Sequence, residues 1–162
     1  MSIINKNMIS VEIILEPNYI KSPPQVDIYI NNKKIKTCIF DKANKSVKYK
    51  FDIESQTENT IRMHRYGKTN KDTVIVDGKT IEDQTLNIEN IIIEKIPLEN
   101  LLHLGTFYPD YPEPWATQQR KLGVNLPESE TYRSKIYHNG NWYFNFETPI
   151  HPWFFSNLNV SF

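Results

Sequence analysis

The chain has 162 residues, which suits one domain with a hydrophobic core that needs no disulfide. Lysine and arginine together number 19, as do aspartate and glutamate, so the formal net charge is zero. This balance argues against nucleic-acid binding driven by a strong general positive field, because phosphate contacts need clustered positive charge. The one cysteine, Cys38, excludes an internal disulfide, and its alternating apolar neighbours predict a small buried side chain.

Residues 33–50 carry an excess of lysine, which leaves room for a local basic face. On strands such side chains alternate outward, where they keep a sheet soluble and protect its edges from pairing. We expect a solvated face here. The lysines are Lys33, Lys34, Lys36, Lys42, Lys45, Lys48 and Lys50.

The sequence gives no indication of export or of a membrane span. No run approaches the ~20 apolar residues that cross a bilayer. The start, MSIINKNMIS, lacks the basic head, apolar core and small-residue cleavage site of a secretory signal. We expect a protein that stays in the cytoplasm where it is made, or leaves by lysis or assembly.

Alternation with a period of two dominates residues 8–96, as in VEIILEP and QVDIYIN. Such alternation places one face of an antiparallel sheet on a core and the other in water. Asn31-Asn32 and Asp77-Gly78 predict hairpin turns, because these residue types tolerate a positive φ. Strands at roughly 10-residue spacing predict an all-β protein, an antiparallel β-sandwich of jelly-roll type. We expect 1–162 to form a single domain, with the main strands in 8–96.

The alternation breaks within the strand expected from Leu86 onwards. Leu86, Ile88 and Ile92 share one register, and Ile91 and Ile93 interrupt it. Either the strand is buried on both faces there, or a bulge shifts its phase. In both cases we expect a long central strand.

The composition changes after Pro97, and residues 103–134 are rich in proline and aromatic residues. Proline fixes φ and removes a donor, so neither a helix nor an inner strand suits most of this segment. Loops of this length are usually functional or pack on a neighbour. We expect a long surface loop, with a short helical turn from Trp115 to Lys121.

The last segment, 135–162, regains strand character. Asn139-Gly140 lies between two alternating runs and predicts a C-terminal hairpin. In the second run, NWYFNF, alternate aromatic residues face one way, and Tyr143 and Asn145 face the other. The prolines of PIHPWFF prevent a regular inner strand in the tail.

Candidate metal ligands are few. Asp72, Asp77 and Asp83, with Glu82, place carboxylates around one turn, and calcium takes oxygen ligands from such loops. No EF-hand pattern is present, and turn chemistry and solvation explain the same residues. The four histidines are far apart, without the spacing of a zinc site. We predict no cofactor, with calcium at the three aspartates as the alternative.

The sequence lacks catalytic signatures. There is no G-x-S-x-G nucleophile motif and no glycine-rich phosphate loop. Paired carboxylates for glycoside hydrolysis could come from Glu113, Glu128 or Glu130, which lie in the aromatic loop. We predict a protein that is not an enzyme and keep a glycan-active enzyme as an alternative.

Aromatic residues are concentrated towards the C-terminus. Tyrosine and tryptophan bury a large area while keeping a polar tip, their flat faces stack on sugar rings, and protein interfaces favour them. They could equally fill the core under the long loop, and Trp142, on an alternating strand, fits that role. The candidate binding or interface residues are Tyr108, Tyr111, Trp115 and Trp153.

Three runs, KTNKDTVIVDGKTIEDQTLNIENIIIEKI, LGTFYPDY and NGNWYFNFETPIHPWFF, carry a resemblance to known proteins. The chain resembles small β-sandwich proteins of T4-like tailed phages, which are similar in shape to carbohydrate-binding modules with a jelly-roll fold. The resemblance implies a virion component: a tail, baseplate or head-decorating protein. Calcium-dependent modules of that broad group carry clustered aspartates on loops, and only Asp72, Asp77 and Asp83 could correspond here.

The leading hypothesis is a non-enzymatic structural or binding module of a bacteriophage virion. It would form oligomers with itself or dock on other virion proteins, without contacts to nucleic acid or membrane. Its physical basis is the loop 107–126, which is aromatic and too long for a mere connection. The first alternative is a carbohydrate-binding module for cell-surface glycans, with Tyr111, Trp115 and Trp153 as its platform. The second is the glycan-active enzyme.

Overall fold

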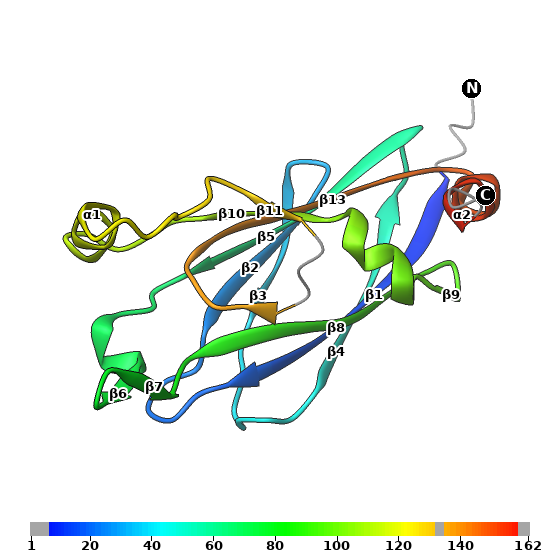
Figure 1. Cartoon of the computed structure of the whole chain (residues 1–162). Helices are drawn as coiled ribbons and strands as arrows, with labels where there is room; N and C mark the ends of the chain where they lie inside the picture. Colours follow the sequence, from blue (N-terminus) through cyan, green and yellow to red (C-terminus); the bar gives the residue numbers. More distant parts are fainter. Residues whose placement is uncertain (1–6, 132–134, 159–162) are drawn as a thin grey trace.

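The computed structural model describes residues 7–131 and 135–158, which form a sandwich of two antiparallel sheets (Figure 1). This confirms the predicted fold class. In spatial order, sheet A consists of β12 (Lys135–Ile136), β8 (Thr85–Ile93), β1 (Met8–Asn18) and β4 (Val47–Glu54), with β9 (Ile96–Pro97) also paired to β8. In spatial order, sheet B consists of β11 (Glu130–Thr131), β10 (Thr106–Pro109), β13 (Gly140–Glu147), β5 (Glu58–Tyr66), β2 (Gln25–Ile30) and β3 (Lys33–Cys38).

The predicted alternation explains the core between the sheets. On β1, Val11, Ile13 and Leu15 are fully buried, with half-buried residues between them. On β13, Trp142 and Phe144 are also fully buried. Removing such apolar surface from water is the main favourable contribution to folding. The same period therefore fixes which side chains remain on the outer faces.

Two predicted hairpins are confirmed by positive φ angles at their turns. Asn31 (φ 52°) and Asn32 (φ 64°) join β2 to β3. Asp77 (φ 53°) and Gly78 (φ 75°) join β6 (Val74–Val76) to β7 (Lys79–Glu82) in a separate two-stranded sheet. Two central residues at positive φ are typical of the type I′ turn, whose twist matches that of the flanking strands.

β8 departs from simple alternation through a β-bulge. Ile14 of β1 pairs with Asn90, whereas the next residue of β1 pairs with Ile88. The extra residue on β8 reverses the phase, so that Ile91 and Ile93 are buried. Of the two alternatives left open by the sequence, the bulge is correct. A turn that the sequence did not indicate, Glu94-Lys95 with φ of 48° and 65°, then joins β8 to β9.

The predicted C-terminal hairpin at Asn139-Gly140 is wrong. β12 pairs with β8 in sheet A, whereas β13 pairs with β5 and β10 in sheet B, so the chain crosses between the sheets here. The glycine permits a close approach: a Cβ on Gly140, at φ 146°, would lie 2.2 Å from the carbonyl oxygen of Tyr108. An Asn-Gly pair marks a site of unusual φ but does not say which strands it joins.

The predicted loop at 103–134 is only partly irregular. β10 and β11 lie within it, as does the helix α1 (Trp115–Lys121), where a short helical turn was predicted. β10 ends at Pro109, which pairs with Gly140 of β13. The segment 110–129, which we call the arm, carries α1 away from the two sheets (Figure 1).

Three further helical segments connect or follow the strands: η1 (Asn70–Asp72), η2 (Glu99–Leu104) and α2 (Ile150–Leu158). As the prolines predicted, the described part of the tail forms no inner strand; it forms the helix α2. Pro152 falls in the first turn, where its missing N–H would have no partner within the helix. Over the described ranges, the structure contains no helix long and apolar enough to cross a membrane.

Candidate ligand-binding face

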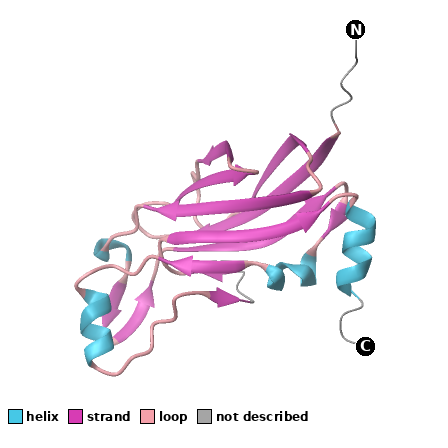
Figure 2. Ribbon diagram, turned by 90° about the horizontal axis from the view of Figure 1, so that it is seen from above, coloured by secondary structure: helices cyan, strands magenta, loops and turns pink. Residues whose placement is uncertain are grey.

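Sheet B leaves alternate side chains of its central strands on an outer face, which Figure 2 views from above. Its inner face carries the core residues, including Trp142 and Phe144. The register of the strands places the outward side chains next to one another. We call them the polar-aromatic face: Thr106 and Tyr108 of β10, Asn141, Tyr143 and Asn145 of β13, Thr60, Arg62, His64 and Tyr66 of β5, and Asp27 and Tyr29 of β2.

Tyr108 and Tyr143 line a hollow on this face. Their rings meet edge to face, with centroids 5.6 Å apart and an angle of 84° between the planes. Tyr108 is 47% exposed, so aromatic surface is available to a ligand. The hollow has a volume of about 570 Å³ and is lined by Thr60, Leu104, Thr106, Tyr108, Asn141, Tyr143 and Asn145.

The two asparagines beside Tyr143 are oriented by strand β5. Thr60 Oγ1 donates a 2.7 Å hydrogen bond to Asn145 Oδ1. Arg62 Nη1 donates a 3.0 Å hydrogen bond to Asn141 Oδ1, and His64 Nδ1 lies 3.1 Å from the same oxygen. All three contacts are made to the amide oxygens. The Nδ2 groups have no hydrogen-bond partner in the described part of the chain and are donors for a ligand.

Arg62 lies between two tyrosines in the register of sheet B, opposite Tyr143 on β13 and Tyr29 on β2. Its guanidinium carbon is 3.9 Å from the centroid of the Tyr29 ring, which is a cation–π contact. The stacked ring and the bond to Asn141 hold a long, otherwise flexible side chain in place.

The face continues beyond Arg62 in a second polar group. The rings of His64 and Tyr66 stack with centroids 5.1 Å apart, and the Tyr66 hydroxyl donates to Asp27 Oδ1 at 3.3 Å. Lys34 Nζ lies 3.5 Å from Asp27 Oδ2. Burial, with the charge of Asp27, raises the pKa of Tyr66.

Two of the predicted binding residues, Tyr111 and Trp115, lie at the base of the arm with His138. The ring centroids of Tyr111 and His138 are 5.1 Å apart, and those of Trp115 and His138 are 5.9 Å apart. The Tyr111 hydroxyl donates a 2.6 Å hydrogen bond to the carbonyl oxygen of Pro127, which links the outgoing and returning parts of the arm. Both aromatic side chains are half-buried, so much of their surface holds the arm together.

The other two predicted binding residues lie in different surroundings. Tyr108 belongs to the polar-aromatic face, as described above. Trp153, on α2, is half-buried against the core, with its ring centroid 6.0 Å from that of Phe144 and 6.4 Å from that of Phe146. The structure therefore does not bring the four predicted residues into one platform.

The glutamates considered for catalysis have mainly local roles. Glu113 accepts hydrogen bonds from the backbone and hydroxyl of Thr117, at 3.3 and 2.6 Å, in the first turn of α1. Glu128 is exposed on the returning part of the arm. Glu130 lies in β11, opposite Phe107 of β10.

Two of the three aspartates considered for calcium, Asp72 and Asp83, bind donors of the protein itself. Asp83 Oδ1 lies 2.6 Å from Lys68 Nζ, and Asp72 accepts from the Thr69 backbone at 2.9 Å and from Ser22 Oγ at 3.0 Å. Asp77 is exposed in the β6–β7 turn. Among the described residues, no three His, Cys, Asp or Glu side chains are grouped to hold a metal ion. A lysine ammonium beside the acids repels a cation, so these residues do not fit a calcium site.

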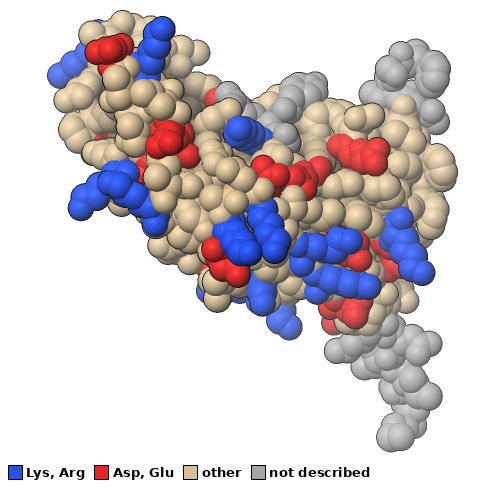
Figure 3. Space-filling view, turned by 90° about the horizontal axis from the view of Figure 1, so that it is seen from below, with Lys and Arg blue, Asp and Glu red and all other residues tan. Residues whose placement is uncertain are grey.

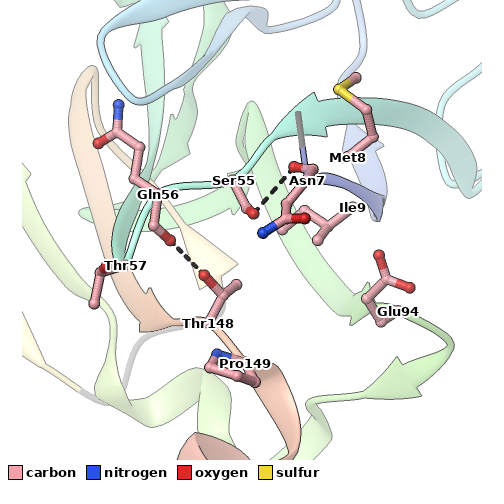
Figure 4. Close-up of a pocket in the computed structure, with 9 residues that line it drawn as sticks. All are labelled: Asn7, Met8, Ile9, Ser55, Gln56, Thr57, Glu94, Thr148 and Pro149. Carbon is pink, nitrogen blue, oxygen red and sulfur yellow. Dashed lines mark hydrogen bonds between the residues drawn. The ribbon is translucent and has the colours of Figure 1, made fainter. Parts of the chain in front are cut away.

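A larger hollow lies at one end of the sandwich (Figure 4). Its volume is about 900 Å³, and none of its lining residues is aromatic. Several of its polar groups bond to one another: Ser55 Oγ donates to the Asn7 carbonyl at 3.1 Å, and Thr148 Oγ1 donates to the Gln56 carbonyl. This hollow therefore offers a ligand less aromatic surface than the polar-aromatic face.

Sequence reasoning identified Tyr108 and the outward register of Tyr143 and Asn145, but not the constellation around them. The available signal was the alternation Asn141-x-Tyr143-x-Asn145 on the outer register of an aromatic strand. Arg62 was missed, because its place beside Tyr143 depends on strand order.

Comparison with known proteins gives matches in fold. The sequence matches no protein-family model and no curated protein sequence. The fold is similar to that of the selenomethionine form of vCBM60, with a TM-score of 0.53 and 9% identity, over 84% of this chain and 89% of that one. That structure belongs to work linking two families of calcium-dependent carbohydrate-binding modules by circular permutation. vCBM60 in complex with galactobiose is similar at a TM-score of 0.48 and 11% identity, over 84% of this chain and 98% of that one.

The chain shares the β-sandwich fold of a carbohydrate-binding module. At 9% identity the likeness concerns the fold and carries no correspondence between residues. The predicted origin in a T4-like phage stays a prediction.

Proposed function

We propose that this protein is a non-catalytic carbohydrate-binding module that holds a sugar chain on the polar-aromatic face. One observation carries the proposal: the ring of Tyr143 is flanked on its own strand by Asn141 and Asn145, whose amide oxygens β5 holds in place. A pyranose presents C–H surface that packs on an aromatic ring and hydroxyls around its rim that need donors and acceptors. Residues two apart on a strand are about 7 Å apart, so both amides can reach hydroxyls of a sugar stacked on Tyr143.

The likeness of fold supports this function over the assembly function favoured by the sequence. The proposal does not rest on calcium, because two of the three candidate aspartates, Asp72 and Asp83, bind the protein's own donors and Asp77 lies exposed in a turn.

The test is a screen of wild-type protein against neutral and acidic glycans, followed by titration of the best glycan with two variants. Tyr143→Ala should weaken binding about 30-fold, because truncating a central aromatic anchor costs about 2 kcal/mol. Tyr137→Ala removes an exposed tyrosine outside the face and should bind like wild type. The proposal is wrong if wild-type protein binds no glycan, or if Tyr143→Ala binds as tightly as wild type.

The arm supports a second candidate function, assembly with other protein chains. Leu122 is 77% exposed and Val124 is 43% exposed, just after α1 on a segment that leaves the sandwich (Figure 1). Adjacent exposed apolar side chains favour a protein contact. A virion location and oligomer formation belong to this candidate.

Light scattering over a range of protein concentrations tests it. Assembly through the arm predicts a mass that rises with concentration, and a Leu122→Ser, Val124→Ser double variant should remain monomeric. A wild-type monomer at all concentrations would argue against self-assembly.

A further inference from the structure

Building on the proposed carbohydrate-binding function, we infer that the glycan is acidic and that Arg62 binds its carboxylate or sulfate group. In the described part of the chain, no carboxylate lies within ion-pair distance of Arg62. The hydrogen bond of its side chain uses one nitrogen, Nη1, which donates to Asn141. A guanidinium has five N–H donors in a planar fork that matches a carboxylate or sulfate. Arg62 thus keeps donors and a full charge for a ligand.

Several lysines of the sandwich have acidic partners, whereas Arg62 has none in the part of the chain that the structure describes. On the outer face of sheet A, Lys48 and Lys50 each lie 3.8 Å from a carboxylate oxygen of Glu12. Figure 3 views this side of the molecule, where lysine and arginine side chains lie beside acidic ones. On the polar-aromatic face Lys34 is paired with Asp27, whereas Arg62 is in contact with a tyrosine ring and an amide.

The position of Arg62 suits an acidic group on a sugar that stacks on Tyr143. The two residues are direct partners in the register of β5 and β13. Neighbouring strands lie about 4.8 Å apart, which is the scale of one sugar ring and its exocyclic substituent. A ring over Tyr143 would therefore place its acidic substituent near the guanidinium.

The charge of the edge strand β3 adds a long-range attraction. β3 holds three lysines, Lys33, Lys34 and Lys36, and no acidic residue, whereas the whole chain is neutral. β3 lies two strands from β5, about 10 Å away. This matches the Debye length of about 8–10 Å at physiological salt, so the lysine field reaches Arg62. Such a field draws a polyanion towards the face.

The experiment compares two matched pairs of polymers on the intact wild-type protein. One pair is polygalacturonate and the same polymer with its carboxylates converted to methyl esters; the other is a sulfated galactan and its desulfated form. Retardation in an affinity gel and calorimetric titration are measured at low and high salt. We expect tighter binding to the acidic member of at least one pair, weakened by salt, and the pair that responds distinguishes carboxylate from sulfate.

Two variants with the same change in charge test Arg62 itself. Arg62→Gln should weaken binding to the acidic polymer about tenfold or more, the expected effect of losing a charge-assisted hydrogen bond. Arg120→Gln, on α1 of the arm, should bind like wild type. A thermal melt shows whether Arg62→Gln is folded. The comparison of acidic and neutral polymers uses the wild-type protein, so it does not depend on the folding of any variant.

The outcomes separate this inference from the proposed function. If the wild-type protein binds each neutral polymer as tightly as its acidic partner, or binds only neutral glycans, the acidic ligand is wrong and the carbohydrate-binding function stands. If folded Arg62→Gln binds the acidic polymer like wild type, the assignment to Arg62 is wrong. If no glycan binds at all, both proposals are wrong.

Discussion

Thr60 Oγ1 donates a 2.7 Å hydrogen bond to Asn145 Oδ1, so strand β5 fixes the amide of its neighbour β13 on the outer face of sheet B. The bond holds the amide in one orientation before any ligand arrives. A preordered donor loses less conformational entropy on binding than a free one.

Replacing Thr60 should therefore weaken glycan binding without unfolding the protein. Thr60→Val keeps the shape of the side chain and removes the donor. We expect affinity to fall about 2- to 10-fold, the range for one hydrogen bond, with little change in melting temperature because the pair is exposed. Titration of wild type, Thr60→Val, Asn145→Ala and the double variant forms a double-mutant cycle. If Thr60→Val lowers the glycan affinity by the same factor in wild type and in Asn145→Ala, Thr60 does not act through Asn145.

Arg65, which follows Arg62 by three residues on β5, faces inward and has a structural role. It is fully buried; Nη1 donates to the Ile136 carbonyl at 3.0 Å, and Nη2 donates to the Gln84 carbonyl at 2.6 Å. These bonds tie sheet B to β12 and to the chain entering β8. Burial lowers the pKa of Arg65 to about 10. This value is still above neutral pH, so the side chain is charged there.

Arg65→Met should lower the free energy of unfolding by about 2–4 kcal/mol, because it leaves several buried carbonyl groups without donors. Arg62→Met, on the outer face of the same strand, removes the same charge and should cost far less. Denaturant unfolding measures both. Equal losses would show that the buried carbonyl contacts of Arg65 are not the source of its effect.

Calcium should neither stabilise this protein nor be needed for glycan binding. Lys68 is bonded to Asp83, and Asp72 is bonded to neighbouring donors, so a cation would have to displace protein contacts. The melting temperature and the glycan affinity should be the same in calcium and in a chelator. A ligand that binds the native state raises the melting temperature. A clearly higher melting temperature in calcium than in the chelator would therefore show that the protein binds calcium, and would contradict this prediction.

Stability should fall as the pH rises from 9 towards 12. Burial raises the pKa of the Cys38 thiol from 9.0 to about 12. Because the folded state holds this proton more tightly than the unfolded state, the contribution is fully present below pH 9 and is lost as the pH approaches 12. Urea unfolding across this range should show a shallower decline for Cys38→Ala than for wild type. Identical slopes would mean that Cys38 does not carry the effect.

Local sequence patterns predicted the strands and two turns, because they depend on neighbouring residues. The alternation of Val11, Ile13 and Leu15 and the turn at Asp77-Gly78 follow from side-chain period and φ preference alone. The failed hairpin at Asn139-Gly140 shows the limit. Whether β12 and β13 pair with each other depends on contacts with β8 and β5, which local patterns do not contain.

The same limit applies to the candidate site. The outward register of Tyr143 and Asn145 was readable from one strand, whereas Thr60 and Arg62 join them only through strand order. Tyr111 and Trp115 stood out by type, yet the structure places much of their surface in contacts that hold the arm. Composition identifies aromatic residues, and only the packing shows which of them face a ligand.

The most direct test of the central claim is to map a bound glycan onto the backbone by NMR. Titration with a glycan that binds should shift the amide signals of Tyr108, Asn141, Tyr143 and Asn145, and leave those of the arm and of the outer face of sheet A in place. Shifts confined to the arm, to the end hollow near Glu94 or to sheet A would contradict a binding site on the polar-aromatic face.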